Sequence, residues 1–192
     1  MSEPTRVAIV GLGGIGGSHA AALAELAATE LAGTGEAVSV VAGSGGAADA
    51  LADWPDAERL DVDEVLACGA DVVVIASPSS LHAEQAIAAL EAGSDVVVEK
   101  PLATTTADAT AVLAAAARTG RRVFPVAQRR LESQHRALRA LYDDGRLGTP
   151  VLIEASVPWW RDAGYYDDSP WRRQAPAGGS LMNQGVHQFD LL

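Results

Sequence analysis

Short apolar runs alternate with longer alanine-rich stretches over the first two thirds of the chain. The runs contain little besides Val, Ile and Ala and do not alternate with polar residues, which is typical of strands covered on both faces. The predicted strands are Val7–Val10, Val38–Ala42, Asp71–Ala76, Val96–Glu99 and Val123–Ala127. The predicted helices between them are Gly14–Ala28, Ala47–Leu51, Val62–Ala67, Leu81–Ala92 and Thr106–Arg118. This alternation predicts an open parallel sheet of the doubly wound α/β type, with all strand carboxyl ends on one edge.

The pattern changes after Ala127, where we place a domain boundary. Residues 1–127 are predicted to form the doubly wound domain, and residues 128–192 the beginning of an α+β domain. The elements predicted in the second part are a helix at Ser133–Asp144, a strand at Val151–Val157, an irregular aromatic stretch at 158–173 and a final helix from near Gly179.

Composition narrows the class of protein. The chain has 192 residues, and with 48% of them hydrophobic its composition is that of a globular protein. Because its net charge is -11, nucleic acid and anionic membranes are poor partners. Cys68 is the single cysteine, which excludes an intrachain disulfide and fits a reducing compartment. Since no apolar run approaches the roughly 20 residues of a membrane span and no signal peptide is apparent, we expect a soluble cytoplasmic protein. We expect no metal site.

A glycine-rich segment directly follows the first predicted strand and opens the first predicted helix. Its residues are Gly11, Leu12, Gly13, Gly14, Ile15 and Gly16. In the pattern Gly-x-Gly-x-x-Gly, the first glycine permits a tight turn, the second lets a pyrophosphate approach the backbone, and the third lets the helix pack on the sheet. The helix N-terminus then faces the phosphates. We interpret the segment as a dinucleotide site; the alternative is a glycine-rich turn.

The second predicted strand ends without the acidic residue that would bind a ribose 2′-hydroxyl. Ser44 and the backbone that follows it are candidates to hold a 2′-phosphate instead. No Arg or Lys follows to bind that phosphate, so the chain leans only slightly toward NADP over NAD. The alternative is a loop that does not discriminate between cofactors.

Further candidates follow two other strands, at the ligand-binding edge. Ser77 and Pro78 come after the third strand, and His82 lies either on the protein surface or beside the cofactor. Glu99 and Lys100 end the fourth strand, and the proline after them stops the ladder. The pair is either a solvated ion pair or part of a reaction centre. Lys100 is the only lysine of the chain, and unlike arginine a lysine can give up its proton, which favours chemistry.

The final predicted helix carries a polar pair. Asn183 and His187 are four residues apart and are predicted to share one helix face, with Asp190 placed to orient the imidazole. The alternative is an ordinary polar helix surface. His19, one turn into the first helix, either contacts the cofactor or packs.

These motifs together resemble the Gfo/Idh/MocA oxidoreductases, which include glucose–fructose oxidoreductase and inositol dehydrogenase. The resemblance rests on segments Gly11–Gly16, Ala76–His82, Glu99–Pro101, Tyr165–Arg172 and Gly178–Asp190. It implies an N-terminal Rossmann domain that binds NAD or NADP, and a C-terminal domain with a large antiparallel sheet that often forms an oligomer interface. A homo-oligomer is therefore expected for the full-length form.

The resemblance also implies roles for individual residues. Lys100 and His187 match residues that act on a substrate hydroxyl or carbonyl, with Asn183 beside them. Trp171 and Arg172 match positions near the cofactor, and Gln128 a position on the nicotinamide side. Some members of the family carry Asp where this chain has Asn183, which cannot take up a proton.

The family members are longer than this chain. A lone strand satisfies neither its backbone groups nor its apolar face, so the second domain is expected to be an incomplete, C-terminally truncated one. The predicted function is NAD(P)-dependent hydride transfer between nicotinamide and a secondary alcohol or ketone of a sugar, nucleotide sugar or cyclitol. The alternative is a non-catalytic dinucleotide-binding protein or an inactive fragment of such an enzyme.

Overall fold

The computed structural model describes residues 3–34, 36–175 and 178–192, without the side chains of Ala48, Pro170 and Trp171. The chain forms two compact units, Met1–Pro125 and Val126–Leu192. The predicted boundary lies two residues further along the chain. Over the described part of the chain, no helix has the length and apolarity needed to cross a membrane.

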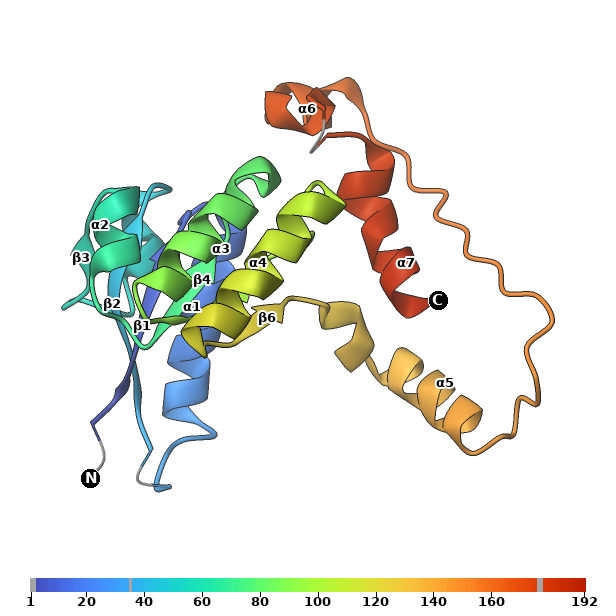
Figure 1. Ribbon diagram of the computed structural model, residues 1–192, viewed down its shortest axis with the longest axis horizontal. Helices are drawn as coiled ribbons and strands as arrows, with labels where there is room; N and C mark the ends of the chain where they lie inside the picture. The colour runs from blue at the N-terminus through green and yellow to red at the C-terminus, as the bar shows by residue number, and fades with distance from the viewer. Residues whose placement is uncertain (1–2, 35, 176–177) are drawn as a thin grey trace. The chain divides into compact units, whose positions relative to one another are not determined.

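The first unit is built on a six-stranded parallel sheet with the order β3-β2-β1-β4-β5-β6 (Figure 1). The strands are β1 (Thr5–Val10), β2 (Val38–Ser44), β3 (Glu58–Arg59), β4 (Val72–Ile75), β5 (Asp95–Val98) and β6 (Val123–Pro125). Strands β2 and β3 follow β1 on one side of it, and β4, β5 and β6 are added on its other side, so the strand order reverses between β1 and β4. This is the Rossmann order, and the predicted doubly wound fold is confirmed.

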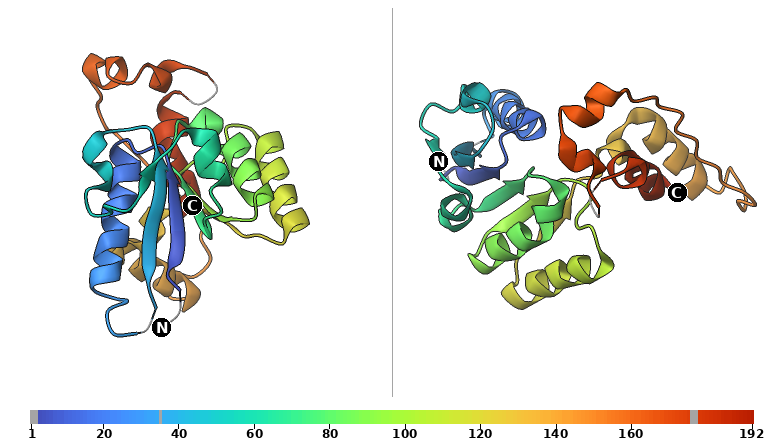
Figure 2. Two further views of the ribbon diagram at one scale, coloured as in Figure 1. Left: turned by 90° about the vertical axis from the view of Figure 1, so that its left-hand side faces the viewer. Right: turned by 90° about the horizontal axis from the view of Figure 1, so that it is seen from above.

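Helices cover both faces of this sheet (Figure 2). Helix α1 (Gly14–Ala28) lies on one face, and α2 (Val62–Ala67), α3 (His82–Glu91) and α4 (Thr106–Thr119) lie on the other. Apolar strand residues divide accordingly between two core clusters. In β1, Val7 and Ile9 belong to the cluster with α1, whereas Ala8 and Val10 belong to the cluster with α2, α3 and α4. Since neighbouring side chains point to opposite buried faces, the strand requires an uninterrupted apolar run.

Two local predictions in this unit differ from the structure. The strand β3 was not predicted, because it has only two residues, Glu58 and Arg59, and both are exposed. The segment predicted as a helix at Ala47–Leu51 is a single 3-10 turn, η1 (Ala48–Leu51). Four residues are too few to propagate an α-helix, and the chain soon turns so that the Trp54 indole donates to the Ala20 carbonyl, 3.0 Å away.

The second unit consists of short helices joined by irregular chain. They are η3 (Gln128–Leu131), α5 (Ser133–Asp143), α6 (Ala163–Asp167), η4 (Pro170–Arg173), the π-helix η5 (Leu181–Gly185) and α7 (Val186–Leu191). The amphipathic helix was predicted to within one residue. The stretch predicted as irregular contains α6 and η4, which its mixed aromatic and charged composition did not indicate.

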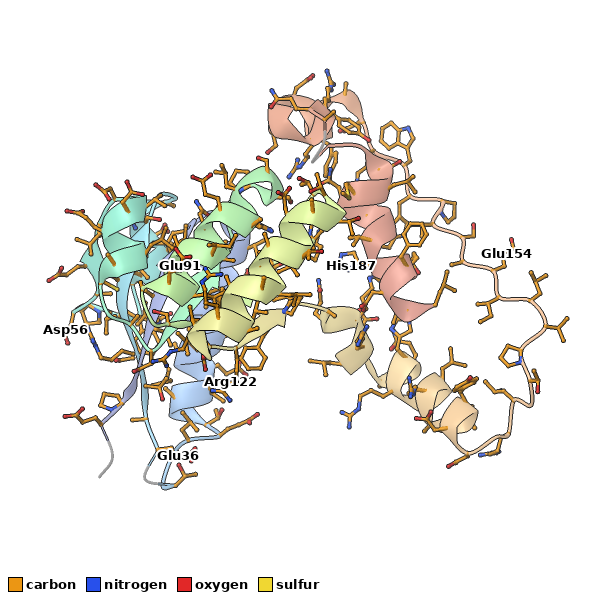
Figure 3. All side chains as sticks on the ribbon, viewed as in Figure 1. Glu36, Asp56, Glu91, Arg122, Glu154 and His187 are labelled. Carbon is orange, nitrogen blue, oxygen red and sulfur yellow. The ribbon has the colours of Figure 1, made fainter. Side chains whose placement is uncertain are left out.

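The predicted strand at Val151–Val157 is wrong. The segment is extended but forms no strand pairing with any described residue; Glu154, labelled in Figure 3, belongs to it. Most of its apolar side chains are exposed, with Val151 at 98% and Leu152 at 83%. A β-prone sequence becomes a strand only where a neighbouring strand bonds its N–H and C=O groups, and within this unit no described segment does so.

An ion pair joins the beginnings of β5 and β6. The largely buried Asp95 carboxylate accepts from the Arg122 backbone N–H at 2.9 Å and from its guanidinium at 2.8 and 2.6 Å. Burial by itself raises the pKa of the Asp95 carboxyl, but the hydrogen bonds and charge of Arg122, with the nearby charge of Arg121, outweigh it and hold the pKa below its ordinary value.

Replacing this carboxylate tests its contribution to the fold. We expect Asp95→Asn to lower the free energy of unfolding at pH 7 by about 1.5–3 kcal/mol, the usual value of a hydrogen bond to a charged group. A carboxyl with a depressed native pKa stabilises the fold above its unfolded pKa and loses that effect as the pH falls through its native pKa. Urea unfolding should therefore show the difference between variant and parent shrinking below about pH 4.

The exposed Asp56, labelled in Figure 3, provides the control. Asp56→Asn should leave the free energy of unfolding nearly unchanged at pH 7 and at pH 3. A deficit in Asp95→Asn that stayed constant from pH 7 to pH 3 would contradict the assignment.

Candidate cofactor and substrate sites

The glycine segment turns sharply between β1 and α1. Gly11 has a φ of +89°, and a Cβ there would lie 2.8 Å from the Ser77 backbone N and 2.9 Å from the Ala76 carbonyl group. A Cβ at Gly16 would collide with the Gly11 carbonyl oxygen. Both positions therefore require glycine, one for the turn and the approach to β4, the other for packing the helix on the turn.

Gly13 has a different reason to be glycine. A Cβ there would meet nothing within 4 Å, so the protein itself leaves space in front of this backbone. Helix α1 begins at the next residue with no side-chain cap and no acidic residue in its first turn. Its first N–H groups thus point outward without a side-chain acceptor, an arrangement suited to an anion. Gly14 is equally open and Ile15 is exposed, whereas Leu12 is buried in the core.

Ser44 supports the glycine turn from behind. Its carbonyl oxygen accepts from the Gly11 N–H at 3.1 Å and the Leu12 N–H at 2.9 Å, and its hydroxyl lies 3.4 Å from the Gly11 N. The residue is only 2% exposed. The hydroxyl is therefore buried under the turn, and the holding of a cofactor phosphate by Ser44 and the backbone that follows it stays a prediction.

Arg59 was missed by the sequence analysis. It lies in β3, and its guanidinium donates to the carbonyls of Ala47 at 3.0 Å and Gly45 at 2.6 Å. A positive charge thus lies beside the loop after β2, where the sequence shows no basic residue close by. The pairing of β3 with β2 brings it there, and a two-residue exposed strand offers no pattern that reveals such a pairing.

The loop after β4 is held by side chains of α3. The Ser77 hydroxyl donates to the Gln85 side-chain oxygen at 2.5 Å, and Pro78 is exposed. His82 is 1% exposed, and its Nδ1 and Nε2 lie 2.7 and 2.8 Å from the carbonyl oxygens of Pro101 and Ser77. The alternative of a surface histidine is wrong. Both ring nitrogens face backbone carbonyls, so the ring has no nitrogen left to contact a cofactor.

Glu99 and Lys100 directly follow β5. The Glu99 N–H donates to the Ile75 carbonyl at 2.9 Å, its Oε1 lies 3.0 Å from His19 Nε2, and its Oε2 accepts from the Lys100 N–H at 3.2 Å. Its side chain is 13% exposed, so the interpretation as a solvated ion pair is wrong for Glu99. Lys100 is half-buried, and its bond to Pro101 is cis.

The electrostatics of Glu99 follow from these contacts. Burial raises the pKa of the carboxyl, but the hydrogen bond and charge of His19 and the backbone N–H and charge of Lys100 lower it further than burial raises it. The net pKa lies below the ordinary value, and Glu99 is a carboxylate at neutral pH. His19, which had two possible roles, packs against this strand end.

The second unit carries the remaining candidates. Gln128 is exposed on η3, and Arg172 donates to the Tyr165 carbonyl at 2.5 Å with its guanidinium 4.0 Å from the Tyr165 ring centre. The side chain of Trp171 lies outside the described residues. Asp190, predicted to orient His187, accepts from the Arg130 guanidinium at 2.9 and 2.7 Å; its action on His187 stays a prediction.

Asn183 and His187 do not lie on one continuous α-helix. Asn183 belongs to the π-helix η5 and His187 to α7, so the spacing of four residues does not align them as it would in an α-helix. Asn183 is buried, and its amide donates to the Gly179 carbonyl at 3.1 Å. Single turns of π-helix are frequent at functional sites, and a pattern based on 3.6 residues per turn does not predict them.

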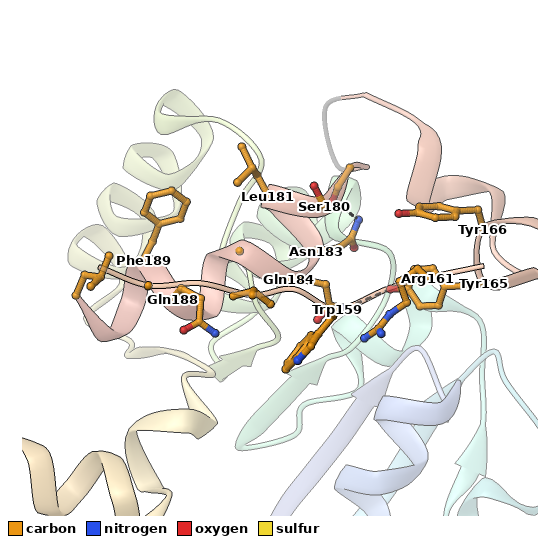
Figure 4. A pocket seen from close by; sticks show the side chains of 15 residues that line it. Trp159, Arg161, Tyr165, Tyr166, Ser180, Leu181, Asn183, Gln184, Gln188 and Phe189 are labelled. Carbon is orange, nitrogen blue, oxygen red and sulfur yellow. Dashed lines mark hydrogen bonds between the residues drawn. The ribbon is translucent and has the colours of Figure 1, made fainter. Parts of the chain in front are cut away.

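A pocket of about 320 Å³ opens beside Asn183 (Figure 4). Aromatic and polar side chains line it, among them Trp159, Arg161, Tyr165, Tyr166, Asn183, Gln184 and Gln188. Gln184 donates to the Tyr165 hydroxyl at 3.1 Å. Aromatic faces with amide and guanidinium groups suit a ligand that is itself part apolar and part hydroxylated. His187 is not among the described lining residues.

The candidate residues are divided between the two units. At the carboxyl edge of the first unit, the glycine turn, the loop after β4 and the Glu99–Lys100 segment contact one another through backbone groups. Asn183 and His187 lie in the second unit. Among the described residues, no group of three or more His, Cys, Asp or Glu side chains is arranged to hold a metal ion.

Comparison with known proteins covers both units. Residues 5–126 match an oxidoreductase family with an NAD-binding Rossmann fold, and residues 135–192 match the GFO/IDH/MocA C-terminal domain. Inositol 2-dehydrogenase of Streptomyces avermitilis is 34% identical over 163 residues, which are 81% of this chain and 45% of that protein. The 1,5-anhydro-D-fructose reductase of Ensifer adhaerens is 32% identical over 163 residues, 82% of this chain and 48% of that protein.

A solved structure extends the likeness. The WlbA dehydrogenase from Bordetella pertussis, in complex with NADH and UDP-GlcNAcA, is 32% identical with a TM-score of 0.86, over 99% of this chain and 57% of that chain. The chain therefore spans about half the length of the relatives it matches.

The open space at Gly13 can be tested directly. Gly13→Ala should fold normally, because its Cβ meets no protein atom, but should weaken NADH binding by about tenfold or more, equal to about 1.4 kcal/mol, since the methyl group occupies the approach of the phosphates. The measurement is a fluorescence titration with NADH, accompanied by urea unfolding.

Gly17→Ala provides the matched control. Gly17 lies within α1, and a Cβ there meets only the Ala50 Cβ at 3.9 Å, so it should keep NADH affinity and be as stable as the parent or more so. Equal NADH affinity in the two variants would contradict the assignment of the glycine turn as the phosphate-binding site.

Proposed function

Because the chain belongs to the Gfo/Idh/MocA oxidoreductase family, whose N-terminal domain is an NAD-binding Rossmann fold, we propose that it transfers hydride between nicotinamide and the secondary alcohol or ketone of a sugar, nucleotide sugar or cyclitol. The single observation that carries the proposal is the position of Lys100. The only lysine of the chain follows β5 by two residues, at the sheet edge that also carries the glycine turn.

The residues present fit a dinucleotide. Gly11 and Gly16 shape the turn, Gly13 leaves space at the backbone, and the uncapped start of α1 offers N–H groups to a pyrophosphate. Those groups would hold the cofactor, which supplies or accepts the hydride when bound. The remaining chemistry falls to the protein.

Two side chains are proposed to act on the substrate oxygen. In the oxidative direction His187 takes up the hydroxyl proton while the carbon gives up its hydride, and an imidazole titrates near neutral pH. Lys100 donates a hydrogen bond to the same oxygen and stabilises the charge that develops on it. The two roles can be exchanged. Asn183 cannot take a proton and is proposed to hydrogen-bond a substrate hydroxyl.

The substrate class rests on the relatives. Their names specify inositol, 1,5-anhydro-D-fructose and, in the Bordetella complex, UDP-GlcNAcA. All three are hydroxylated rings, or their nucleotide conjugates. The aromatic and amide groups around the pocket beside Asn183 suit such a ring.

Substitution of Lys100 tests the reaction. Lys100→Met should retain NADH binding, because Lys100 is not part of the glycine turn, and should lower turnover by about 10² to 10⁴, the usual range for a proton-handling group. The measurement is the initial rate of NAD⁺ reduction by this chain with a panel of inositols and nucleotide sugars, together with an NADH titration.

Arg146→Met is the control, since it removes an exposed positive charge of the second unit. Turnover that is equal in Lys100→Met and the parent would exclude the proposed role. A parent chain that binds NADH yet oxidises no member of the panel would instead favour a non-catalytic dinucleotide-binding protein.

The cofactor is proposed to be NAD(H). Two features slightly favour NADP: no acidic residue follows β2, and the charge of Arg59 lies beside that loop. The relatives do not support this preference, because the Bordetella structure holds NADH. Titrations with NADH and NADPH should give the lower Kd for NADH. Arg59→Ala should reduce any NADPH binding more than NADH binding; a lower Kd for NADPH in the parent would reverse the assignment.

A further inference from the structure

The His82 ring joins the loops that follow β4 and β5. Its Nε2 lies 2.8 Å from the Ser77 carbonyl, and its Nδ1 lies 2.7 Å from the Pro101 carbonyl. The ring is 1% exposed, and His82 is the first residue of α3. A ring in this place is fixed by the helix and by both bonds.

Both partners of the ring are acceptors. A ring nitrogen that carries a proton donates it to the carbonyl that it faces, and the role argued below requires the proton on Nδ1, which faces Pro101. Removal of the ring would leave that carbonyl without its donor. The carbonyl of Pro101 is the one that concerns Lys100, because it belongs to the next residue along the chain. The Ser77 carbonyl belongs to another strand end.

The short segment around Lys100 is held on both sides. Before it, the Glu99 N–H donates to the Ile75 carbonyl, and the Glu99 carboxylate is bound to His19. After it, the Pro101 carbonyl faces His82. His19 comes from α1 and His82 from α3, helices on opposite faces of the sheet.

We propose that His82 is a positioning residue for Lys100 that acts through the Pro101 carbonyl. The inference rests on the proposed function only for what Lys100 does to a substrate. The position of Lys100 is a property of the unliganded chain, so it can be measured without turnover.

Two conservative substitutions separate the two bonds of the ring. An asparagine amide nitrogen occupies about the position of Nδ1, and a glutamine amide nitrogen about that of Nε2. His82→Asn therefore keeps the donor to Pro101 and loses the donor to Ser77. His82→Gln does the reverse. A role in stability alone predicts similar effects for both, whereas the proposed role predicts different effects on Lys100.

The single lysine makes the measurement selective. Reductive methylation with carbon-13 formaldehyde labels only the Lys100 amine and the chain's α-amino group, and it keeps the charge of the amine. The position and pH titration of the Lys100 methyl signal are then read by NMR in the parent, His82→Asn and His82→Gln. The same substitutions at His135, whose Nδ1 lies 2.8 Å from the Arg129 carbonyl, are the controls.

The expected result is a displaced Lys100 signal in His82→Gln and a parental signal in His82→Asn and both His135 variants. In an active preparation kcat should fall about ten- to hundredfold in His82→Gln alone, with the KM for NAD⁺ unchanged. Parental signals in both His82 variants, or equal displacement in both, would overturn the proposal. If His82→Gln does not fold, folded His82→Asn decides: a parental signal supports the proposal and a displaced signal overturns it.

A failure of the proposed function would give a different result from a failure of the positioning role of His82. In that case Lys100 can be substituted without loss of turnover, while the Lys100 signal still distinguishes His82→Gln from His82→Asn.

Discussion

The parallel ladder of β1, β4 and β5 is the constraint on which the candidate site depends. Val10 pairs with Ile75 and Ile75 with Val98, so the three strands end at the same level of the sheet. The residues that follow them must therefore share one edge. Gly11 shows how closely they meet, since even one methyl group there would touch the backbone after β4.

This ladder could be predicted because it rests on a strong local pattern. Strands buried on both faces need continuous apolar residues, and Val72–Ile75 and Val96–Val98 supply them. The same reasoning failed for Val151–Val157, whose residues are equally prone to form a strand. A strand requires a partner, and the sequence of one segment does not show whether that partner exists. Propensity thus predicted the longer strands of the first unit, where partners are present, and wrongly predicted a strand in the second, where no described segment pairs with it.

The same contrast holds for the candidate site residues: some belong to contiguous sequence motifs, and others depend on contacts with residues distant in the sequence. The glycine turn and the Glu99–Lys100 segment are contiguous motifs, and the sequence placed both at the ligand edge. The contributions of Arg59 and His82 depend on contacts with distant backbone carbonyls, and nothing in their neighbours along the chain indicates them. The burial of Ser44 at the end of β2 was not predicted either, because it depends on how β2 packs against the turn. The π-helix at Asn183 was not predictable from an α-helical period.

The contacts of Glu99 explain why a charged pair at a strand end is more than a solvated surface feature here. A carboxylate that loses water must regain hydrogen bonds, and Glu99 regains them from His19 and from the Lys100 backbone N–H. Its lowered pKa shows that these contacts outweigh the cost of burial. The negative charge is therefore satisfied by an imidazole and a main-chain donor that are fixed by α1 and by β5. The backbone from which the lysine side chain extends is consequently held by the fold itself, and this rigidity is what a group that must meet a substrate oxygen requires.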